Sequence, residues 1–217
     1  MSEVSIKTPS FNHLSTVDLD LIYAPSEDTF LLIDALEKDL KEIVKLEPCI
    51  CLEIGVGSGV VITALGSALG PSSLYFGTDV NEFACKKAEE TAHLNGVTLK
   101  TFCCNFVDNV PDSVKGSVDV LIFNPPYVVT ESDEILSSPL ASAWAGGEKG
   151  REVIDKLFPS LSSILSPRGV FYLLLEKNNK PKEVSSILEH LGFSSTCILS
   201  RKNLSETLYV MKFTRKL

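Results

Sequence analysis

Residues 50–59 read Ile-Cys-Leu-Glu-Ile-Gly-Val-Gly-Ser-Gly and give the clearest indication of the fold. A short apolar strand with an acid near its end, Glu53, leads into three glycines at alternate positions and then into an apolar helical segment. Glycine lets a ligand approach the backbone closely, and the amides at the start of a helix favour an anionic group. A bare turn from strand to helix would use one glycine and rarely three, so the stretch predicts a cofactor-binding loop.

The spacing of the glycines indicates which cofactor the loop suits. Gly55, Gly57 and Gly59 are followed by Val60, where a dinucleotide-binding fingerprint has its third glycine. The loop therefore favours S-adenosylmethionine (SAM) over a nicotinamide cofactor.

Strand-like and helical segments alternate along the chain. Strands are expected at 50–54, 73–79, 98–104, 118–123, 169–176, 194–200 and 206–213, and helices at 58–69, 81–95, 150–165 and 181–191, with a further helix opening at Ser26. This alternation predicts βαβ units in an α/β fold with a mainly parallel, doubly wound sheet. The short link 201–205 predicts that the last two strands form a hairpin.

The expected arrangement resembles the Rossmann-like class I SAM methyltransferases, with seven mostly parallel strands, an antiparallel last strand and helices on both faces. Residues 1–20 are polar and irregular, which predicts a flexible or loosely docked arm. Residues 21–217 are expected to form a single methyltransferase domain, since no linker or repeat divides them.

Two more strand ends carry candidate cofactor residues. Asp79 ends the second strand, where a carboxylate suits both ribose hydroxyls of a nucleoside; the alternative is that it caps the helix beginning near Asn81. Asn105 ends the third strand, where its amide oxygen suits the adenine amino group and Phe106 the flank of the ring. The alternative for Asn105 is a simple turn residue.

The fourth strand, 118–123, ends in Asn124-Pro125-Pro126-Tyr127. Two prolines stop a strand and make the backbone rigid. The Asn124 side-chain oxygen and the Pro125 carbonyl can accept the two N–H bonds of a planar NH2 group, while Tyr127 covers its face. An amide nitrogen attacks poorly because its lone pair is delocalised, so catalysis needs positioning and preorganised acceptors. With the glycine loop, the tetrapeptide predicts a SAM-dependent N-methyltransferase.

Composition restricts the substrate and the setting. The net charge of −8 and the pI near 5.0 make duplex DNA a poor substrate, because neutralising phosphates carries most of that affinity. Among the six cysteines no Cys-x-x-Cys pair occurs, so no metal site is expected. Cys49, Cys51, Cys103 and Cys104 lie in or beside apolar runs, which predicts reduced, buried thiols and a cytoplasmic or nuclear protein. The N-terminus lacks an apolar signal core.

Three longer stretches carry a family resemblance: Tyr23-Ala-Pro-Ser-Glu-Asp-Thr-Phe30, Phe123-Asn-Pro-Pro-Tyr-Val-Val129 and Ala143-Trp-Ala-Gly-Gly-Glu-Lys-Gly-Arg-Glu-Val153. They are similar to the catalytic subunit of the eukaryotic and archaeal HemK-type release-factor glutamine methyltransferases, from about residue 20 to the C-terminus. The resemblance implies methylation of glutamine N5 in the Gly-Gly-Gln motif of the class I translation termination factor. It also implies a small zinc-binding activator protein as the partner in a heterodimer.

The resemblance also implies which residues contact cofactor and substrate. The cofactor-binding set is Thr29, Glu53, Gly55, Gly57, Asp79, Asn105, Phe106 and Asn124. The substrate-binding set is Asn124, Pro125, Pro126 and Tyr127, of which Asn124, Pro125 and Tyr127 are the candidate catalytic residues. The family often has Asp at the position of Asn105, a departure that bears on cofactor affinity. For Trp144, a position in the wall of a substrate channel is favoured over a surface turn. Arg151 could equally be a solvent-exposed residue in the first turn of a helix, and no catalytic role is assigned to it.

Other functions share parts of this pattern. A DNA adenine N6-methyltransferase would use Asn-Pro-Pro-Tyr in the same way, to hold an NH2 group. The negative net charge of the chain and the absence of a separate recognition domain in its sequence weigh against this function. A protein-lysine methyltransferase needs deprotonation of an amine and no clamp on a planar amide. A scaffold subunit with an inactive methyltransferase fold is disfavoured because both motifs are intact.

The third strand is expected to be the outer edge of the sheet. Its sequence, 98–104, is apolar except for Lys100, and an exposed edge of this kind invites pairing with another chain. We therefore expect the activator subunit to add a strand here. The alternative is that a helix or the N-terminal arm covers the edge.

Overall fold

The computed structural model describes residues 5–136, 138, 141–203 and 206–216. The strands are β1 (Ile50–Ile54), β2 (Leu74–Asp79), β3 (Leu99–Cys103), β4 (Val118–Phe123), β5 (Leu165–Glu176), β6 (Phe193–Lys202) and β7 (Thr207–Arg215). The α-helices are α1 (Thr16–Leu19), α2 (Glu27–Lys38), α3 (Leu40–Leu46), α4 (Val60–Leu69), α5 (Glu82–Leu94), α6 (Glu152–Leu157), α7 (Leu161–Ile164) and α8 (Pro181–His190). Short 3-10 turns are η1 (Ser132–Leu136), η2 (Ala141–Ala143), η3 (Glu148–Gly150), η4 (Phe158–Ser160) and η5 (Lys177–Asn179).

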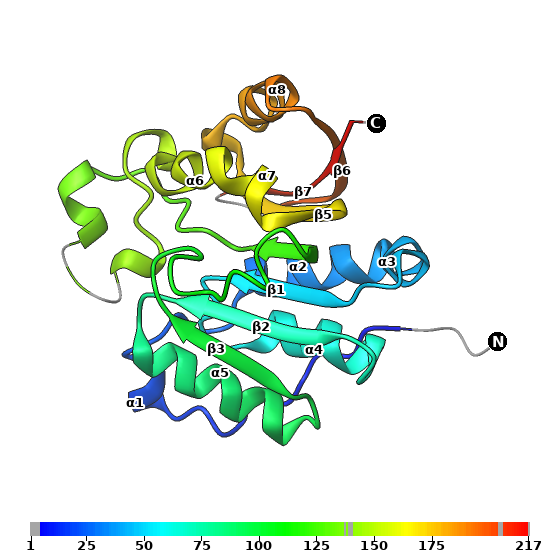
Figure 1. The fold of residues 1–217 in the computed structure, drawn as a ribbon. Helices are drawn as coiled ribbons and strands as arrows, with labels where there is room; N and C mark the ends of the chain where they lie inside the picture. The colour runs from blue at the N-terminus through cyan, green and yellow to red at the C-terminus, as the bar shows by residue number, and fades with distance from the viewer. Residues whose placement is uncertain (1–4, 137, 139–140, 204–205, 217) are drawn as a thin grey trace.

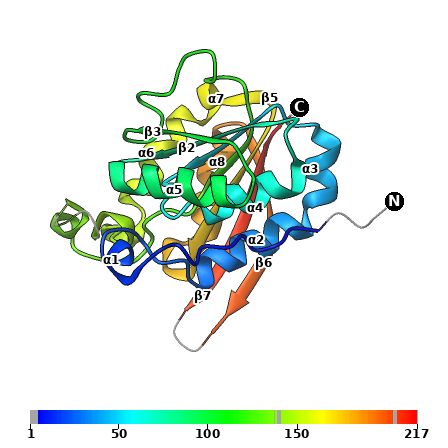
Figure 2. The ribbon, with the colours of Figure 1, turned by 90° about the horizontal axis from the view of Figure 1, so that it is seen from below.

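The seven strands form one sheet in the order β3-β2-β1-β4-β5-β7-β6. All neighbours pair in parallel except β7, which is antiparallel to both β5 and β6. The expected seven-stranded sheet, its antiparallel last strand and the β6–β7 hairpin are confirmed, and Figure 2 shows the hairpin projecting from the sheet. Two positions of its link, 204 and 205, lie outside the described residues.

Apolar side chains project from both faces of the sheet, because successive residues of a strand point to opposite sides. On one face, strand residues such as Cys51 and Val120 pack with α2, α3, α4 and α5. On the other face, Leu52 and Leu121 pack with α6, α7 and α8. Helices therefore cover both faces, as expected, and Figure 1 shows α4 and α5 on the side of the sheet opposite α8.

One expected helix is wrong as a single element. The segment 150–165 is divided into η3, α6, η4 and α7. Pro159 lies in the dividing turn; it has no N–H to donate, and in a continuous α-helix its ring would clash with the preceding turn. The sequence prediction also omitted α1 and α3.

The expectation of uniformly buried cysteines is wrong in two of the four positions named. All six cysteines are free; Cys51 and Cys104 are buried, whereas Cys49 and Cys103 are exposed. Cys103 is the last residue of the edge strand β3 and Cys49 precedes β1. Side chains next to strand ends or on the edge of the sheet can thus be exposed to solvent even within apolar stretches of sequence.

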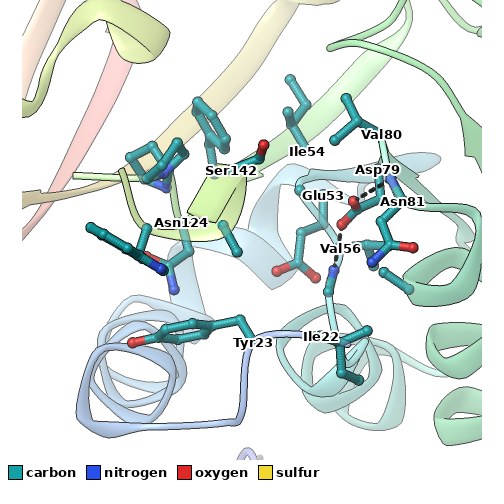
Figure 3. A pocket seen from close by; sticks show the side chains of 18 of the residues that line it. Ile22, Tyr23, Glu53, Ile54, Val56, Asp79, Val80, Asn81, Asn124 and Ser142 are labelled. Atoms are coloured by element: carbon teal, nitrogen blue, oxygen red, sulfur yellow. Dashed lines mark hydrogen bonds between the residues drawn. The ribbon is translucent and has the colours of Figure 1, made fainter. Parts of the chain in front are cut away.

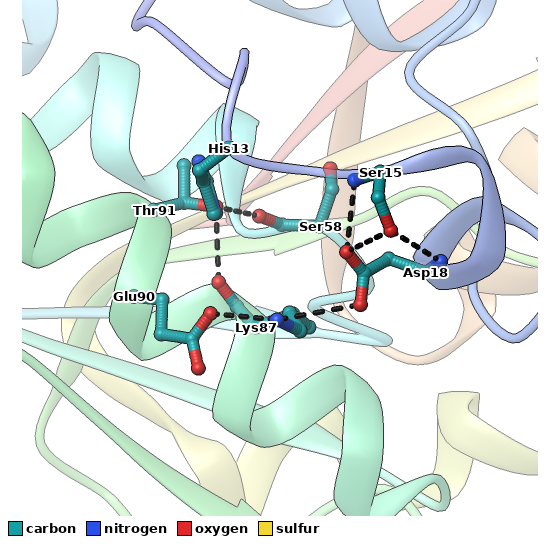
Figure 4. A network of polar contacts seen from close by, with 7 residues as sticks. All are labelled: His13, Ser15, Asp18, Ser58, Lys87, Glu90 and Thr91. Atoms are coloured by element: carbon teal, nitrogen blue, oxygen red, sulfur yellow. Dashed lines mark hydrogen bonds and ion pairs between the residues drawn. The ribbon is translucent and has the colours of Figure 1, made fainter.

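In the described part of the N-terminal arm, residues 10–18 lie against α5 and its C-cap Asn95 (Figure 4), whereas the amide of Ile6 donates to Glu37 of α2. Asp18 pairs with Lys87 of α5 at 3.3 Å, and the ring of His13 lies 3.3 Å from the hydroxyl of Thr91. Thr91 also donates to the carbonyl of Ser58, in the glycine loop, at 2.6 Å. The arm is thus joined through α5 to the glycine loop, and its flexibility stays a prediction.

The glycine loop approaches α5 so closely that a side chain cannot fit at Gly59. A Cβ at this position would lie 2.7 Å from the Cα of Ala88, and the residue has φ +76°. Gly96 has nearly the same φ, +74°, but nothing lies within 4 Å of its Cβ position. Alanine at Gly96 would therefore suffer backbone strain alone, whereas alanine at Gly59 would suffer both backbone strain and steric overlap.

Gly59→Ala should therefore lower the free energy of unfolding more than Gly96→Ala. The left-handed backbone costs each variant about 1–2 kcal/mol, and the overlap with Ala88 adds about 1–3 kcal/mol at residue 59 only. Urea unfolding of both variants measures the difference. Equal losses would show that α5 moves away from the loop at no cost.

Candidate active site

A cavity of about 290 Å³ lies at the carboxyl ends of β1, β2 and β4. The strand order reverses between β1 and β4, and open α/β sheets bind ligands at such a point. The structure brings every predicted site residue into the lining of this cavity: Thr29, Glu53, Gly55, Gly57, Asp79, Asn105, Phe106, Asn124, Pro125, Pro126 and Tyr127. Figure 3 shows Asp79 and Asn81 at one end, Asn124 and Tyr23 at the other, and Glu53 between them.

Asp79 links the glycine loop to the turn after β2. Its Oδ2 accepts from the Gly57 amide at 2.9 Å, and its Oδ1 accepts from the Asn81 amide at 2.9 Å. The cap of α5 is Asn81, whose side chain accepts from the Phe83 amide at 2.9 Å. Burial raises the pKa of Asp79, and the two amides oppose that shift. Each carboxylate oxygen keeps a further lone pair, so both remain able to accept hydroxyl donors.

Glu53 is an acid held inside the cavity wall at the end of β1. It is only 2% exposed, and its Oε2 accepts from the Ile62 amide in α4 at 3.0 Å. Burial raises the pKa of Glu53 well above its ordinary value, and the nearby Asp79 charge adds to the shift. Such a carboxyl is suited to a cationic or hydroxyl-bearing ligand that replaces its lost water.

The turn after β3 supplies an apolar wall. Phe106 is half-buried with φ +45°, and its ring meets that of Phe123 edge to face, with the centroids 6.3 Å apart. Asn105 is exposed and borders the same cavity. This combination of a flat apolar wall and a neighbouring amide can hold a planar ring with an amino group.

Asn124 lies at the opposite end with one half of its amide paired. Its Nδ2 donates to Asp28 Oδ2 at 3.1 Å, whereas its Oδ1 is buried with no hydrogen-bond partner among the described residues. A buried acceptor without a partner is unfavourable by about 1–3 kcal/mol, so such a group usually marks a place for a ligand donor. The arrangement can hold an N–H group of a substrate.

Two tyrosines flank this end of the cavity. Burial and the nearby Asp28 carboxylate raise the pKa of Tyr23 to about 12. The same two causes raise the pKa of Tyr127. Both hydroxyls therefore keep their protons at neutral pH, and Tyr127 offers a neutral aromatic face.

A second loop, 143–151, braces the Asn-Pro-Pro-Tyr segment through Asn179. The Asn179 side chain is fully buried, and its Nδ2 donates to the carbonyls of Tyr127 at 2.8 Å and Lys149 at 3.0 Å. Trp144 lines the cavity, and its carbonyl accepts from the Val128 amide at 3.0 Å. A role for Trp144 as the wall of a substrate channel stays a prediction.

Arg151 is not a solvent-exposed residue. It is 6% exposed, donates to both carboxylate oxygens of Asp155 at 2.9 and 3.1 Å, and pairs with Glu183 of α8 at 3.0 Å. These contacts tie the 143–151 loop to α8.

Sequence reasoning assigned no role to several residues of this site. Asp28, Tyr23 and Asn179 contact the Asn-Pro-Pro-Tyr segment from other parts of the chain. The first two belong to the stretch 23–30 that carries the family resemblance, which was the available signal. Nothing in the sequence around Asn179 indicates a role at this site, because an asparagine in the turn after a strand is common.

Two negative findings concern the described residues. Within the ranges given above, no three His, Cys, Asp or Glu side chains gather as a metal site would require. None of the described helices combines the length and the apolar character needed to cross a membrane.

Glu53→Gln should raise the melting temperature of the ligand-free protein, and the gain should increase with pH. The folded-state pKa of Glu53 is raised, so its contribution to stability is full below the unfolded pKa and is lost as the pH rises through the folded pKa. An amide still accepts from the Ile62 amide but carries no charge.

Melting curves at about pH 5 and about pH 8 make the comparison. Glu82→Gln is the matched control, since Glu82 is exposed and pairs with Lys86 at 2.7 Å. The account of Glu53 is wrong if its variant melts lower than the wild type at the higher pH.

Comparison with known proteins agrees with this geometry. The methyltransferase small domain family matches residues 27–144. Methyltransferase HEMK2 of Mus musculus is 43% identical over 99% of this chain and 100% of its own length. The eRF1 methyltransferase catalytic subunit mtq2 of Schizosaccharomyces pombe is 37% identical over 97% of this chain and 96% of its own.

A solved structure extends the likeness to the fold. The E. cuniculi Mtq2–Trm112 complex, described as responsible for methylation of the eRF1 translation termination factor, has a chain with TM-score 0.67 and 32% identity. The match covers 90% of this chain and 99% of that chain. The chain is therefore a methyltransferase that belongs to the methyltransferase small domain family, together with HEMK2 and Mtq2.

Proposed function

We propose that this chain is the catalytic subunit of a SAM-dependent glutamine N5-methyltransferase that modifies the Gly-Gly-Gln motif of the class I release factor. The observation that carries the proposal is the buried Oδ1 of Asn124, which has no partner in the described residues and lies in the cavity wall. An unpaired acceptor beside a rigid Pro-Pro turn suits a planar NH2 group. The choice of the release factor as substrate rests on the relatives that are named for methylation of eRF1.

The residues of the cavity fit SAM by their chemistry. Asp79 has lone pairs for two ribose hydroxyls beside the glycine loop, and Asn105 with Phe106 offers an amide and an apolar wall to adenine. Glu53 gives a buried carboxyl in the middle of the cavity, suited to an ammonium group. Gly55, Gly57, Thr29 and Asn124 complete the proposed cofactor-binding set. When bound, the cofactor supplies an electrophilic methyl group on a sulfonium.

The Asn-Pro-Pro-Tyr segment orients the substrate amide. Asn124 Oδ1 accepts one N–H and the Pro125 carbonyl the other, which returns electron density to the nitrogen as it attacks the methyl carbon. Pro126 is buried and fixes the turn, and Tyr127 covers the face of the amide. The bound cofactor would supply its methyl group to this nitrogen, which would give up one of its two protons. Positioning supplies most of the acceleration.

Strand β3 is the proposed docking edge for a small zinc-binding activator subunit. It is one of the two edges of the sheet, and its only charged residue is Lys100. The backbone amide and the hydroxyl of Thr101 both donate to Glu89 Oε1 at 2.8 Å, so this amide points away from β2. A partner strand would take the place of the Glu89 carboxylate on this amide. The presence of Trm112 with the related Mtq2 chain supports a two-subunit enzyme.

The location of the enzyme is part of the proposal. We place the enzyme in the cytoplasm or the nucleus. Its proposed substrate, a translation factor, acts in the cytoplasm, and free thiols are typical of both compartments.

Incubation with labelled SAM tests the function. The co-expressed complex of this chain and its activator should label recombinant release factor, and the label should disappear when the glutamine of Gly-Gly-Gln is replaced. Labelling of duplex DNA instead would favour the adenine N6-methyltransferase. Labelling of release factor at lysine would favour the protein-lysine methyltransferase.

Asn124→Ala should abolish detectable transfer while SAM affinity stays within about threefold. The acceptor acts chiefly when the nitrogen attacks, so the loss belongs to turnover and not to cofactor binding. Single-turnover labelling and calorimetric titration with SAM measure the two quantities. Substantial activity in this variant would remove Asn124 from the mechanism.

Thr101→Pro should weaken the heterodimer more than the isolated fold. Proline removes the amide that the partner strand needs, and the substitution also removes both hydrogen bonds from Thr101 to Glu89. Glu89→Ala is the matched control, because it removes the same two bonds within the chain but leaves the amide available. Co-purification and melting temperatures should show loss of the partner in Thr101→Pro only. A heterodimer that tolerates the proline would exclude strand addition at this edge.

A further inference from the structure

Asn124 and Asp28 form a buried pair whose orientations depend on each other. Asp28 is 2% exposed and lies in the first turn of α2, 96 positions before Asn124. Its Oδ2 accepts from Asn124 Nδ2 at 3.1 Å. Its Oδ1 accepts from the backbone amide of Thr29 at 2.7 Å. Each carboxylate oxygen therefore has a fixed task.

The carboxylate is itself held by the first turn of the helix. The Thr29 hydroxyl lies 3.4 Å from Asp28 Oδ1 as a donor and accepts from the Ser26 amide at 3.2 Å. Because the Thr29 amide belongs to the helix backbone, it cannot turn away from Asp28. Residue 28 must therefore always present an oxygen on that side.

The pair removes an ambiguity that an asparagine alone would have. A side-chain amide can rotate by half a turn, which exchanges its oxygen and its NH2 group at almost unchanged shape. A carboxylate has no hydrogen to donate, so it accepts the NH2 group and repels the oxygen. Asn124 consequently directs its oxygen to the cavity, where it is buried without a partner in the described residues.

We propose that Asp28 is a positioning residue for methyl transfer, which holds the Asn124 oxygen toward the NH2 group of the substrate. The inference rests on the proposed function, since a substrate NH2 group is the donor that the free oxygen would receive. With the opposite orientation, Asn124 would present two N–H donors to a substrate that also brings N–H donors, and the clamp would fail.

Asp28→Asn tests this role because it keeps the size of the side chain. The new amide must place its oxygen on the Thr29 amide, so its NH2 group faces Asn124. Asn124 then turns its own oxygen away from the cavity. We expect kcat on release factor to fall by about tenfold or more, as for loss of a hydrogen bond in the transition state, with SAM affinity within about threefold.

Exchanging the two side chains supplies the rescue. In the double variant Asp28→Asn with Asn124→Asp, the carboxylate at 124 accepts from the amide at 28 with one oxygen and presents the other to the substrate. We expect its kcat to exceed that of Asp28→Asn by about tenfold. A residue that only supported the fold would not be rescued by replacing Asn124.

The variants are compared as complexes with the co-expressed activator, and melting temperatures confirm that they are folded. A kcat for Asp28→Asn within about threefold of the wild type, or a double variant no more active than Asp28→Asn, would overturn the inference. Failure of the proposed function looks different, because the wild-type complex then labels no release factor at all.

Discussion

The reversal of strand order between β1 and β4 is the constraint on which the site depends. Ile54 is paired with Phe123, so the chain leaves both strands at the same level of the sheet. Gly55 and Asn124 follow directly, and a Cβ on Gly55 would lie 3.9 Å from the Asn124 carbonyl. The glycine loop and the Asn-Pro-Pro-Tyr segment therefore lie next to each other although they are far apart in the sequence. In the proposed function, this contact brings the methyl group and the amide nitrogen into one cavity.

The loops at this switch point are held by parts of the chain far from them in sequence. The first turn of α2 fixes Asn124 through Asp28, and Asn179 after β5 fixes the Tyr127 carbonyl. In the glycine loop, the carbonyl of Ser58 accepts a hydrogen bond from Thr91 of α5. Each is a buried or half-buried polar contact with the backbone or with an amide, which favours one loop conformation over its alternatives. Preorganisation of this kind suits a reaction whose barrier is lowered mainly by positioning.

Much of this architecture could be predicted from the sequence, because its signals are local. The apolar strands, the glycine loop and the polar residues at strand ends each occupy a few consecutive positions, and the switch-point rule then brings them together. The 150–165 segment was harder, since its helical pattern continued through Pro159. The exposure of Cys103 depends on the last position of an edge strand, which apolar composition does not reveal. The family resemblance of the stretch 23–30 marked the segment that contains Asp28, but not its contact with Asn124, which exists only in the folded chain.

The direction of the Asn124 oxygen is the central claim, and a crystal structure of the heterodimer with demethylated cofactor and a glutamine-containing Gly-Gly-Gln peptide tests it most directly. The account predicts the glutamine side-chain nitrogen within hydrogen-bonding distance of Asn124 Oδ1 and the Pro125 carbonyl, with Asn124 Nδ2 still on Asp28. A glutamine nitrogen bound elsewhere in the cavity, or an Asn124 oxygen turned toward another protein group, would contradict the account.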